Sequence, residues 1–190
     1  MRLLWGFIIC VLVISCKGKP AGEVAADSKD TIQFYQVSQF VQSQVNEVLK
    51  TPYYIYKKTT QNGKTDSVPI TNEQFAALAE HFSKPDITSP GLKSNYTENA
   101  FFDNTTKNYN LNYSTRNKNL EVQNIDVLLK EDGESLNRIF IRKFFSYADS
   151  SAIEQLSWKP NESFQISRMI QMPDGKESLR QTVVVWNDKK

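Results

Sequence analysis

The spacing of the hydrophobic residues divides the chain into three parts. An apolar segment comes first, a region of helical periodicity follows, and apolar and polar residues alternate over most of the remainder. Between residues 34 and 49 the apolar side chains recur every three or four positions, at Phe34, Val37, Val41, Val45 and Val48. This spacing predicts an amphipathic helix with one buried face. Pro52 ends the segment.

A β-hairpin is predicted after this helix. Residues 53–60 and 65–68 are rich in Tyr, Thr and Val, which favour strands. Asn62 and Gly63 lie between them, and this dipeptide readily adopts the two positive φ angles of a type I′ turn. The two strands are therefore expected to pair directly.

A second helix is predicted from residue 71. Thr71 and Gln74 have the spacing of a capping box, in which each side chain bonds the other residue's backbone N–H. Apolar residues follow at helical spacing, and Pro85 ends the pattern. Residues 86–107 have no clear periodicity because turn-forming residues interrupt them.

The period changes to two after residue 108. Strands are predicted over 109–113, 120–129, 136–147, 152–158, 164–172 and 179–186. Short Asn, Asp, Gly and Pro-containing turns separate them, so successive strands should be antiparallel neighbours. We predict an α+β fold in which two or three N-terminal helices pack on one face of a C-terminal antiparallel meander sheet that is twisted and could be curved.

Composition and charge limit the chain to one ordinary domain. The 190 residues are 39% hydrophobic, and 23 Lys and Arg oppose 21 Asp and Glu, for a net charge of +2. This length suits a single domain, which we place at 31–190. So small a net charge excludes electrostatically driven nucleic-acid binding.

The N-terminal apolar segment has the features of a secretion signal. Arg2 precedes an apolar run from Leu3 to Ile14. As a helix this run would reach roughly 18 Å, short of the ~30 Å of a bilayer core. We therefore interpret it as the hydrophobic region of a signal peptide.

The end of this run resembles the bacterial lipobox. The residues are Val13-Ile14-Ser15-Cys16, and the other cysteine, Cys10, lies inside the apolar run. The resemblance implies that residues 1–15 are a lipoprotein signal peptide, that the Cys16 thiol is acylated, and that residues 16–30 form a flexible tether. The alternatives are a short N-terminal anchor and an ordinary cleaved signal, although the latter would leave Cys16 without a disulfide partner.

The sorting signal after the cysteine indicates a destination. Lys17 follows Cys16, and no acidic cluster comes next. By resemblance to Gram-negative sorting rules, this favours the outer membrane, with the domain facing the periplasm. In composition and order of elements the chain resembles small lipoproteins of Bacteroidota.

Few residues are available for catalysis. An acylated Cys16 leaves the mature chain without a thiol, and His81 is the one imidazole in the sequence. Zinc motifs with two or three histidines are therefore excluded. We interpret His81 as a solvated surface residue. No G-x-S-x-G motif is present, which argues against a Ser-His-Asp triad, and the isolated turn glycines argue against a P-loop or dinucleotide site. We therefore predict no catalytic residues, metal or cofactor.

Paired carboxylates are the remaining acid/base chemistry. Glu131, Asp132 and Glu134 surround a turn glycine, so we interpret them as a solvated loop. Asp126 interrupts an apolar strand and is a candidate for an inward-facing carboxylate. A carboxylate-dependent glycan hydrolase would need two such groups facing each other.

Aromatic residues suggest a ligand surface. Tyr54 and Tyr56 lie on one predicted strand, and Phe144 and Tyr147 lie on another. Aromatics on both faces of a strand mean either that helices cover the second face or that it forms a groove. These four residues are our groove candidates.

A basic cluster lies beside Phe144. Arg138, Arg142 and Lys143 could stack on nucleic-acid bases, but the low net charge favours a charged edge strand that resists aggregation.

Two short motifs resemble the Asp-Ser/Thr-apolar acceptor of Bacteroidota O-glycosylation. They are Asp30-Thr31-Ile32 and Asp66-Ser67-Val68. The resemblance makes Thr31 and Ser67 candidate glycosylation sites.

These observations lead to three functional hypotheses. The first is a non-enzymatic, lipid-anchored envelope protein that binds a protein partner or an apolar or glycan ligand. The second is a half-barrel lipid carrier or envelope-assembly factor, which would need an apolar cavity. The third is the carboxylate-dependent hydrolase.

Overall fold

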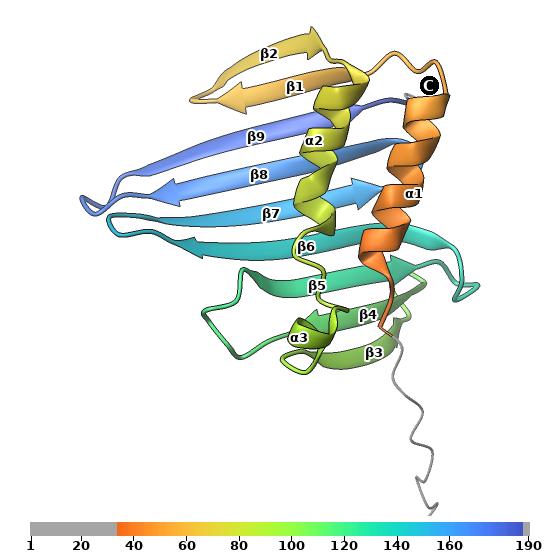
Figure 1. Cartoon of the computed structure of the whole chain (residues 1–190). Coiled ribbons are helices and arrows are strands. Elements are labelled where there is room, and N and C mark those ends of the chain that lie inside the picture. The colour runs from red at the N-terminus through yellow and green to blue at the C-terminus, as the bar shows by residue number, and fades with distance from the viewer. Residues whose placement is uncertain (1–33, 188–190) are drawn as a thin grey trace, which may run out of the picture. The chain divides into compact units, whose positions relative to one another are not determined.

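The computed structural model of the chain describes residues 34–187 (Figure 1). Its helices are α1 (Val37–Lys50), α2 (Asn72–Ser83) and α3 (Pro90–Lys93). Its strands are β1 (Tyr56–Gln61), β2 (Lys64–Pro69), β3 (Thr97–Asp103), β4 (Asn108–Ser114), β5 (Val122–Leu129), β6 (Leu136–Ser146), β7 (Ser151–Lys159), β8 (Ser163–Gln171) and β9 (Glu177–Val185). The predicted signal peptide, Cys16, the tether and Thr31 lie outside the described residues.

All nine strands belong to one antiparallel sheet. Their order is β2-β1-β9-β8-β7-β6-β5-β4-β3. From β3 to β9 each strand pairs with the next along the chain, as short turns require. The N-terminal hairpin extends the sheet because β1 pairs with β9, the last strand. The edges of the sheet are β2 and β3.

The prediction of an α+β fold is wrong. One nine-stranded sheet dominates the molecule, and the helices are short, with 14, 12 and 4 residues. The hairpin β1–β2 joins the sheet through a long-range pairing with β9, a partner that no local pattern in the hairpin specifies. Strand β3 was not predicted because turn-forming residues, among them Asp103 and Asn104, interrupt the pattern of residues 86–107.

Local predictions are confirmed within this sheet. Asn62 and Gly63 have φ angles of 52° and 74° in the β1–β2 turn. The Thr71 hydroxyl accepts from the Gln74 N–H at 3.3 Å, and the Gln74 side chain accepts from the Thr71 N–H at 3.0 Å. The six strands predicted after residue 108 correspond to β4–β9.

Helices α1 and α2 cross the strands on one side of the sheet, which we call the covered face (Figure 1). Phe82 of α2 packs edge-on against Trp158 of β7, with ring centroids 5.0 Å apart. The ring centroid of Phe75 lies 5.6 Å from that of Phe164 of β8. Because side chains alternate along a strand, the residues between these buried positions belong to the opposite side, which we call the open face.

Within residues 34–187, no helix is both long and apolar enough to cross a membrane.

Candidate ligand groove on the open face

A groove of about 770 Å³ lies on the open face of β5, β6 and β7, beside the loop that joins β4 to β5. Both polar and aromatic side chains border it. Its lining consists of Thr115, Lys118, Gln123, Asn124, Asp126, Phe140, Ile141, Arg142, Phe144, Ile153, Gln155 and Leu156. The groove is therefore mixed in character rather than purely apolar.

Strand register places these side chains together. Arg142 of β6 is paired with Asn124 of β5 on one side and with Gln155 of β7 on the other. Phe144 is paired with Ile153. Directly paired residues project from the same face with Cβ atoms about 5 Å apart, so these five side chains form one continuous surface.

Asp126 is held in a network of asparagine amides. The Asn112 amide donates to Asp126 Oδ1 at 2.6 Å, and the Asn124 amide donates to Asp126 Oδ2 at 2.6 Å. The Asn112 amide also lies 2.8 Å from Asn124 Oδ1. The candidate carboxylate thus lies on the open face and not in the core, and its two amide partners fix its orientation.

Two cations at the groove have no partner. The side chains of Lys118 and Arg142 are exposed and make no hydrogen bond or ion pair with any described residue. Arg138, on the same strand, differs because it donates to Ser157 Oγ at 3.0 Å and lies over the Phe140 ring at 5.8 Å. Lys118 and Arg142 are therefore available to a ligand.

The interpretation of this basic cluster as an edge-strand pattern is wrong. Strand β6 lies between β5 and β7 in the middle of the sheet. Lys143 points to the covered face, where it is 3% exposed, donates to the Lys84 carbonyl and lies 2.8 Å from Glu121 Oε1. The charges on β6 therefore have different roles on the two faces.

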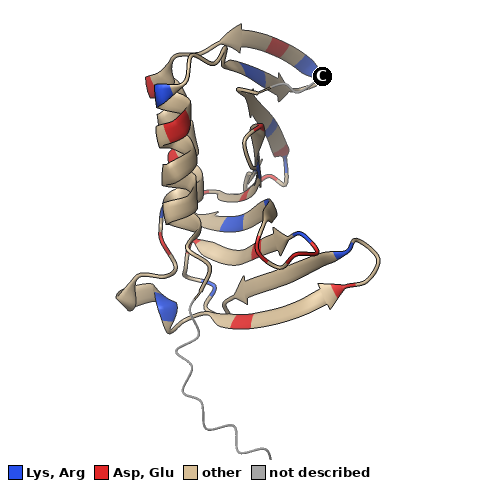
Figure 2. Cartoon of the chain, turned by 90° about the vertical axis from the view of Figure 1, so that its right-hand side faces the viewer, with Lys and Arg blue, Asp and Glu red and all other residues tan. Residues whose placement is uncertain are grey.

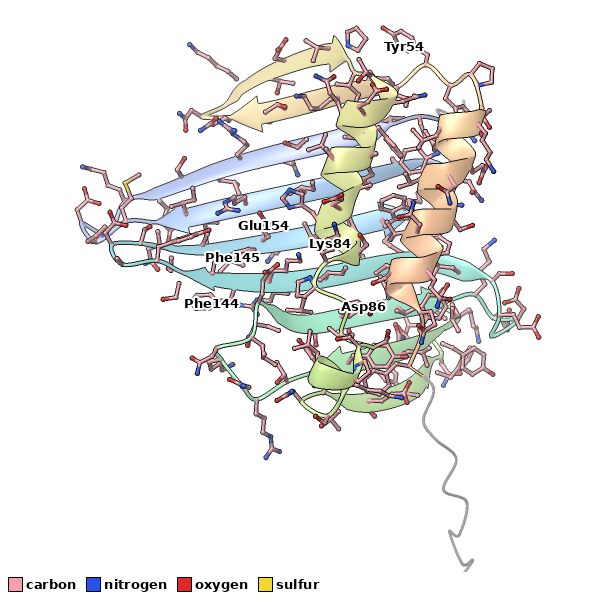
Figure 3. All side chains as sticks on the ribbon, in the orientation of Figure 1. Tyr54, Lys84, Asp86, Phe144, Phe145 and Glu154 are labelled. Carbon is pink, nitrogen blue, oxygen red and sulfur yellow. The ribbon has the colours of Figure 1, made fainter. Side chains whose placement is uncertain are left out.

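The four aromatic candidates do not form one site. Phe144 lines the groove, and it lies on β6 beside Phe145 in Figure 3. Tyr56 is on the open face of β1, four strands away from β6, and Tyr54, 73% exposed, precedes β1. Tyr147 follows β6 and accepts a hydrogen bond from Arg168 Nη2 at 2.7 Å.

A second polar cluster lies on the covered face around Glu154 of β7. This residue is 1% exposed. Its carboxylate accepts a hydrogen bond from Arg168 Nη1 at 2.6 Å, and His81 Nδ1 lies 3.2 Å from its other oxygen. Burial raises the pKa of Glu154, but the hydrogen bonds from His81 and Arg168 outweigh it and lower the pKa overall. His81 lies at the surface as predicted, with a side chain that is 39% exposed, but it also contacts Glu154 and so joins α2 to the sheet.

The remaining candidates lie in exposed positions. Glu131, Asp132 and Glu134 are exposed in the β5–β6 turn, where Asp132 Oδ1 accepts from the backbone N–H groups of Glu134 and Ser135. Ser67 is exposed on the edge strand β2. Among the described residues, no three His, Cys, Asp or Glu side chains are grouped to hold a metal. Basic and acidic positions are interspersed along the fold (Figure 2).

The amides of Asn124 and Gln155, which line the groove, and of Asn112, which bonds Asp126 beside it, were not predicted from the sequence. Asn112, Asn124 and Gln155 each occupy the polar position of an alternating strand, which by itself indicates only a solvent-facing residue. The signal that could have found them is the register of neighbouring strands, since pairing β5 with β6 places Asn124 next to Arg142. A bulge at Gln123 shifts that register and was not evident from the sequence.

Comparisons with known proteins add little. No protein-family model matches the sequence, and no curated protein is similar to it. A similarity was found to the solved structure of the S-type phycobiliprotein lyase CPES from Guillardia theta, covering 80% of this chain and 99% of that chain. The sequence identity is 10% and the TM-score is 0.24, which is too low to support a conclusion about fold or function.

Proposed function

We propose that this chain is a non-enzymatic envelope protein, anchored in the outer membrane through acylated Cys16, whose open-face groove binds a glycan ligand. The observation that carries the proposal is the groove itself. It combines the unpaired cation Arg142 with the amide of Gln155 and the ring of Phe144. Sites that bind small molecules typically combine apolar walls with a few polar groups in this way.

The mixture of groups favours a glycan over an apolar ligand. Sugar rings have C–H faces that stack on aromatic side chains and hydroxyl groups that bond to amides and guanidinium groups. Phe140 and Phe144 supply the first kind of contact, and Asn124, Arg142 and Gln155 supply the second. An acyl chain would leave the side chains of Arg142 and Gln155 without partners, at a cost of about 1–3 kcal/mol for each buried group.

The lipid-carrier alternative has less support. A carrier would enclose its lipid between the helices and the sheet, but aromatic side chains fill that region. The stacked pair Trp158 and Phe164 and the ring of Phe82 lie within 5.2 Å of one another there, measured between centroids. The apolar interior is therefore packed where a lipid would have to enter.

A carboxylate-dependent hydrolase also has less support at this groove. Such enzymes place two carboxyl groups about 5–9.5 Å apart across the scissile bond. Asp126 is the carboxylate among the residues that line the groove, and two asparagines already bond it. The groove accordingly suits binding better than hydrolysis.

Native mass spectrometry of the full chain, extracted from a bacterial envelope in mild detergent, tests the binding proposal. We expect a co-purified adduct of glycan mass on the wild type and on Phe101→Ser, and none on Gln155→Ala. Phe101→Ser is the control because Phe101 lies on the open face but on the edge strand β3, outside the groove, and is 52% exposed. A wild-type mass that carries no glycan adduct beyond the lipid on Cys16, or a glycan adduct that Gln155→Ala retains, would contradict the proposal.

Metabolic labelling with an alkyne analogue of palmitate tests the anchor. We expect the wild type to be labelled and to sediment with outer membranes, and Cys16→Ala to lose both properties. Cys10→Ala is the control, since Cys10 lies within the apolar run of the signal. Equal labelling of wild type and Cys16→Ala would overturn the anchor.

A further inference from the structure

The open face carries a polar row that crosses every strand of the sheet. Its members are consecutive cross-strand partners, and each carries a hydroxyl, amide or guanidinium group. In order from β3 to β2 they are Thr97, Ser114, Asn124, Arg142, Gln155, Ser167, Gln181, Thr60 and Thr65. None of them is buried. Neighbouring strands are ~4.8 Å apart, so hydrogen-bonding groups repeat at that interval.

An apolar row runs parallel to the polar row. It consists of Phe144, Ile153, Met169 and Leu179 on β6 to β9, again as consecutive cross-strand partners. Each of these residues lies two positions along its strand from a member of the polar row, which places the two rows ~7 Å apart. A third row lies beyond the apolar row, on the side away from the polar row, and consists of Ser146, Ser151, Gln171 and Glu177. The apolar row is therefore one side chain wide.

The polar row and the apolar row extend between two hollows of the open face. The groove on β5–β7 contains Arg142, Gln155, Phe144 and Ile153. A second hollow of about 250 Å³ lies at the other end and is lined by Thr60, Gln61, Asn62, Gly63, Leu179 and Gln181. Ser167 and Met169 of β8 lie between the hollows, one in each row. The surface is thus a continuous track from β5 to β1.

We infer that this track binds a linear, acidic polysaccharide that lies across the strands. The inference rests on the proposed function and names its ligand class. A polymer that presents hydroxyl groups at regular intervals matches a polar row that repeats once per strand. Its ring faces match the parallel apolar row, where Phe144 provides an aromatic contact. A ligand longer than the groove would also occupy the second hollow.

The positive charges along the track favour an acidic polymer over a neutral one. Arg142 stands in the polar row and Lys118 borders the same groove, and both lack partners among residues 34–187. Asp126, the carboxylate of the groove, already accepts hydrogen bonds from Asn112 and Asn124. A guanidinium group binds carboxylate or sulfate substituents through charge-assisted hydrogen bonds, which are the strongest available here.

Other occupants match the track less well. A peptide that adds a strand requires a sheet edge, whereas the track crosses the middle of the face. An amphipathic helix presents an apolar stripe at least 100° wide, and an acyl chain presents no polar groups. Neither complements a single apolar row between two polar rows.

Fluorescence polarisation with labelled oligosaccharides tests the inference on the full chain in non-ionic detergent. The probes are a fluorescein-labelled oligogalacturonate and a neutral galactan oligosaccharide of the same length. We expect tighter binding of the acidic probe, and a loss of about tenfold or more for that probe in Arg142→Gln. The matched control is Arg180→Gln, which removes the same charge from the covered side of β9, where Arg180 bonds Gln61.

The outcomes separate this inference from the proposed function. Equal binding of both probes, or equal effects of Arg142→Gln and Arg180→Gln, would overturn the acidic specificity but leave glycan binding in place. If neither probe binds, the polysaccharide inference fails, whereas a co-purified adduct that depends on Gln155 would still support a ligand in the groove. Binding that Gln181→Ala does not weaken would contradict a track that reaches β1.

Discussion

Charged side chains have different environments on the two faces of the sheet. On the covered face the charged side chains of Lys143 and Glu154 are buried, and each is paired with a residue from outside its own strand. On the open face Arg142 and Lys118 have no partner in the described part of the chain. The buried charges of the covered face are therefore part of the architecture, whereas the side chains of Arg142 and Lys118 remain available to a ligand.

This difference shows where stability and binding reside. The buried residues form one cluster that joins α1 and α2 to the covered side of the strands. Removing a side chain from it leaves a cavity, while removing one from the open face mainly changes solvent-exposed surface. Substitutions should accordingly separate into those that unfold the protein and those that abolish binding.

The largest effect on stability is expected for Phe82→Ala. Phe82 is 3% exposed and contacts the rings of Trp158 and Phe164. Truncation should lower the free energy of unfolding by about 3–5 kcal/mol. Urea denaturation followed by tryptophan fluorescence measures this loss. The open-face counterpart Phe101→Ala should cost less than about 1 kcal/mol, and similar losses for the two variants would abolish the distinction between the faces.

The next largest effect is expected for Glu154→Gln. The variant removes the negative charge and replaces one acceptor oxygen by an amide donor, so one bond to Arg168 or His81 is lost and the other is weakened, at a cost of about 2–3 kcal/mol. Arg168→Gln tests the same cluster from its cation, because it leaves the buried carboxylate with His81 alone and also removes the hydrogen bond to Tyr147. A stability equal to that of the wild type would mean that α2 is held without the Glu154 cluster.

The same residue predicts a pH dependence. The folded-state pKa of Glu154 lies below its ordinary value of 4.5. Its contribution to stability is therefore complete above the unfolded pKa and is lost as the pH falls through the folded pKa. Between pH 6 and pH 3 the wild type should lose more stability than Glu154→Gln, as measured by urea denaturation at each pH. Parallel losses would contradict the pairing.

A smaller effect is expected at the start of α2. Thr71→Ala removes the hydroxyl that accepts from the Gln74 N–H and should cost about 1 kcal/mol. Thr71→Ser keeps this acceptor and should retain most of the stability. Equal melting temperatures for the two variants would show that the cap does not contribute.

The smallest effect on stability is expected for Arg142→Gln. The side chain is exposed and unpaired, so the free energy of unfolding should change by less than about 0.5 kcal/mol. Binding of the acidic oligosaccharide should nevertheless fall. A large loss of stability would show that Arg142 belongs to the architecture after all.

The sequence was informative where structure is local. The capping box of Thr71 and the turn at Asn62-Gly63 follow from the conformations of a few adjacent residues, and both predictions are confirmed. The pairing of β1 with β9 was not predicted because it joins segments far apart in the chain, and no local pattern specifies such a partner.

The candidate site was predicted only in part for the same reason. Phe144 was identified from its residue type, and it lines the groove. The polar row depends on the register of eight neighbouring strand pairs, including the bulge between Val122 and Asn124. His81 and Glu154 are 73 positions apart, so their pairing became evident only when α2 was placed over β7.

The account's central claim, that the open face is a binding surface, is tested most directly by blocking its centre. Ser167 lies in the polar row on β8, between the two hollows, and Ser167→Trp would place a bulky ring across the track. Ser43→Trp, on the exposed side of α1, is the control. By fluorescence polarisation of labelled oligogalacturonate, Ser167→Trp should bind at least about tenfold more weakly than wild type and Ser43→Trp equally well. Undiminished binding by a folded Ser167→Trp variant would contradict the account.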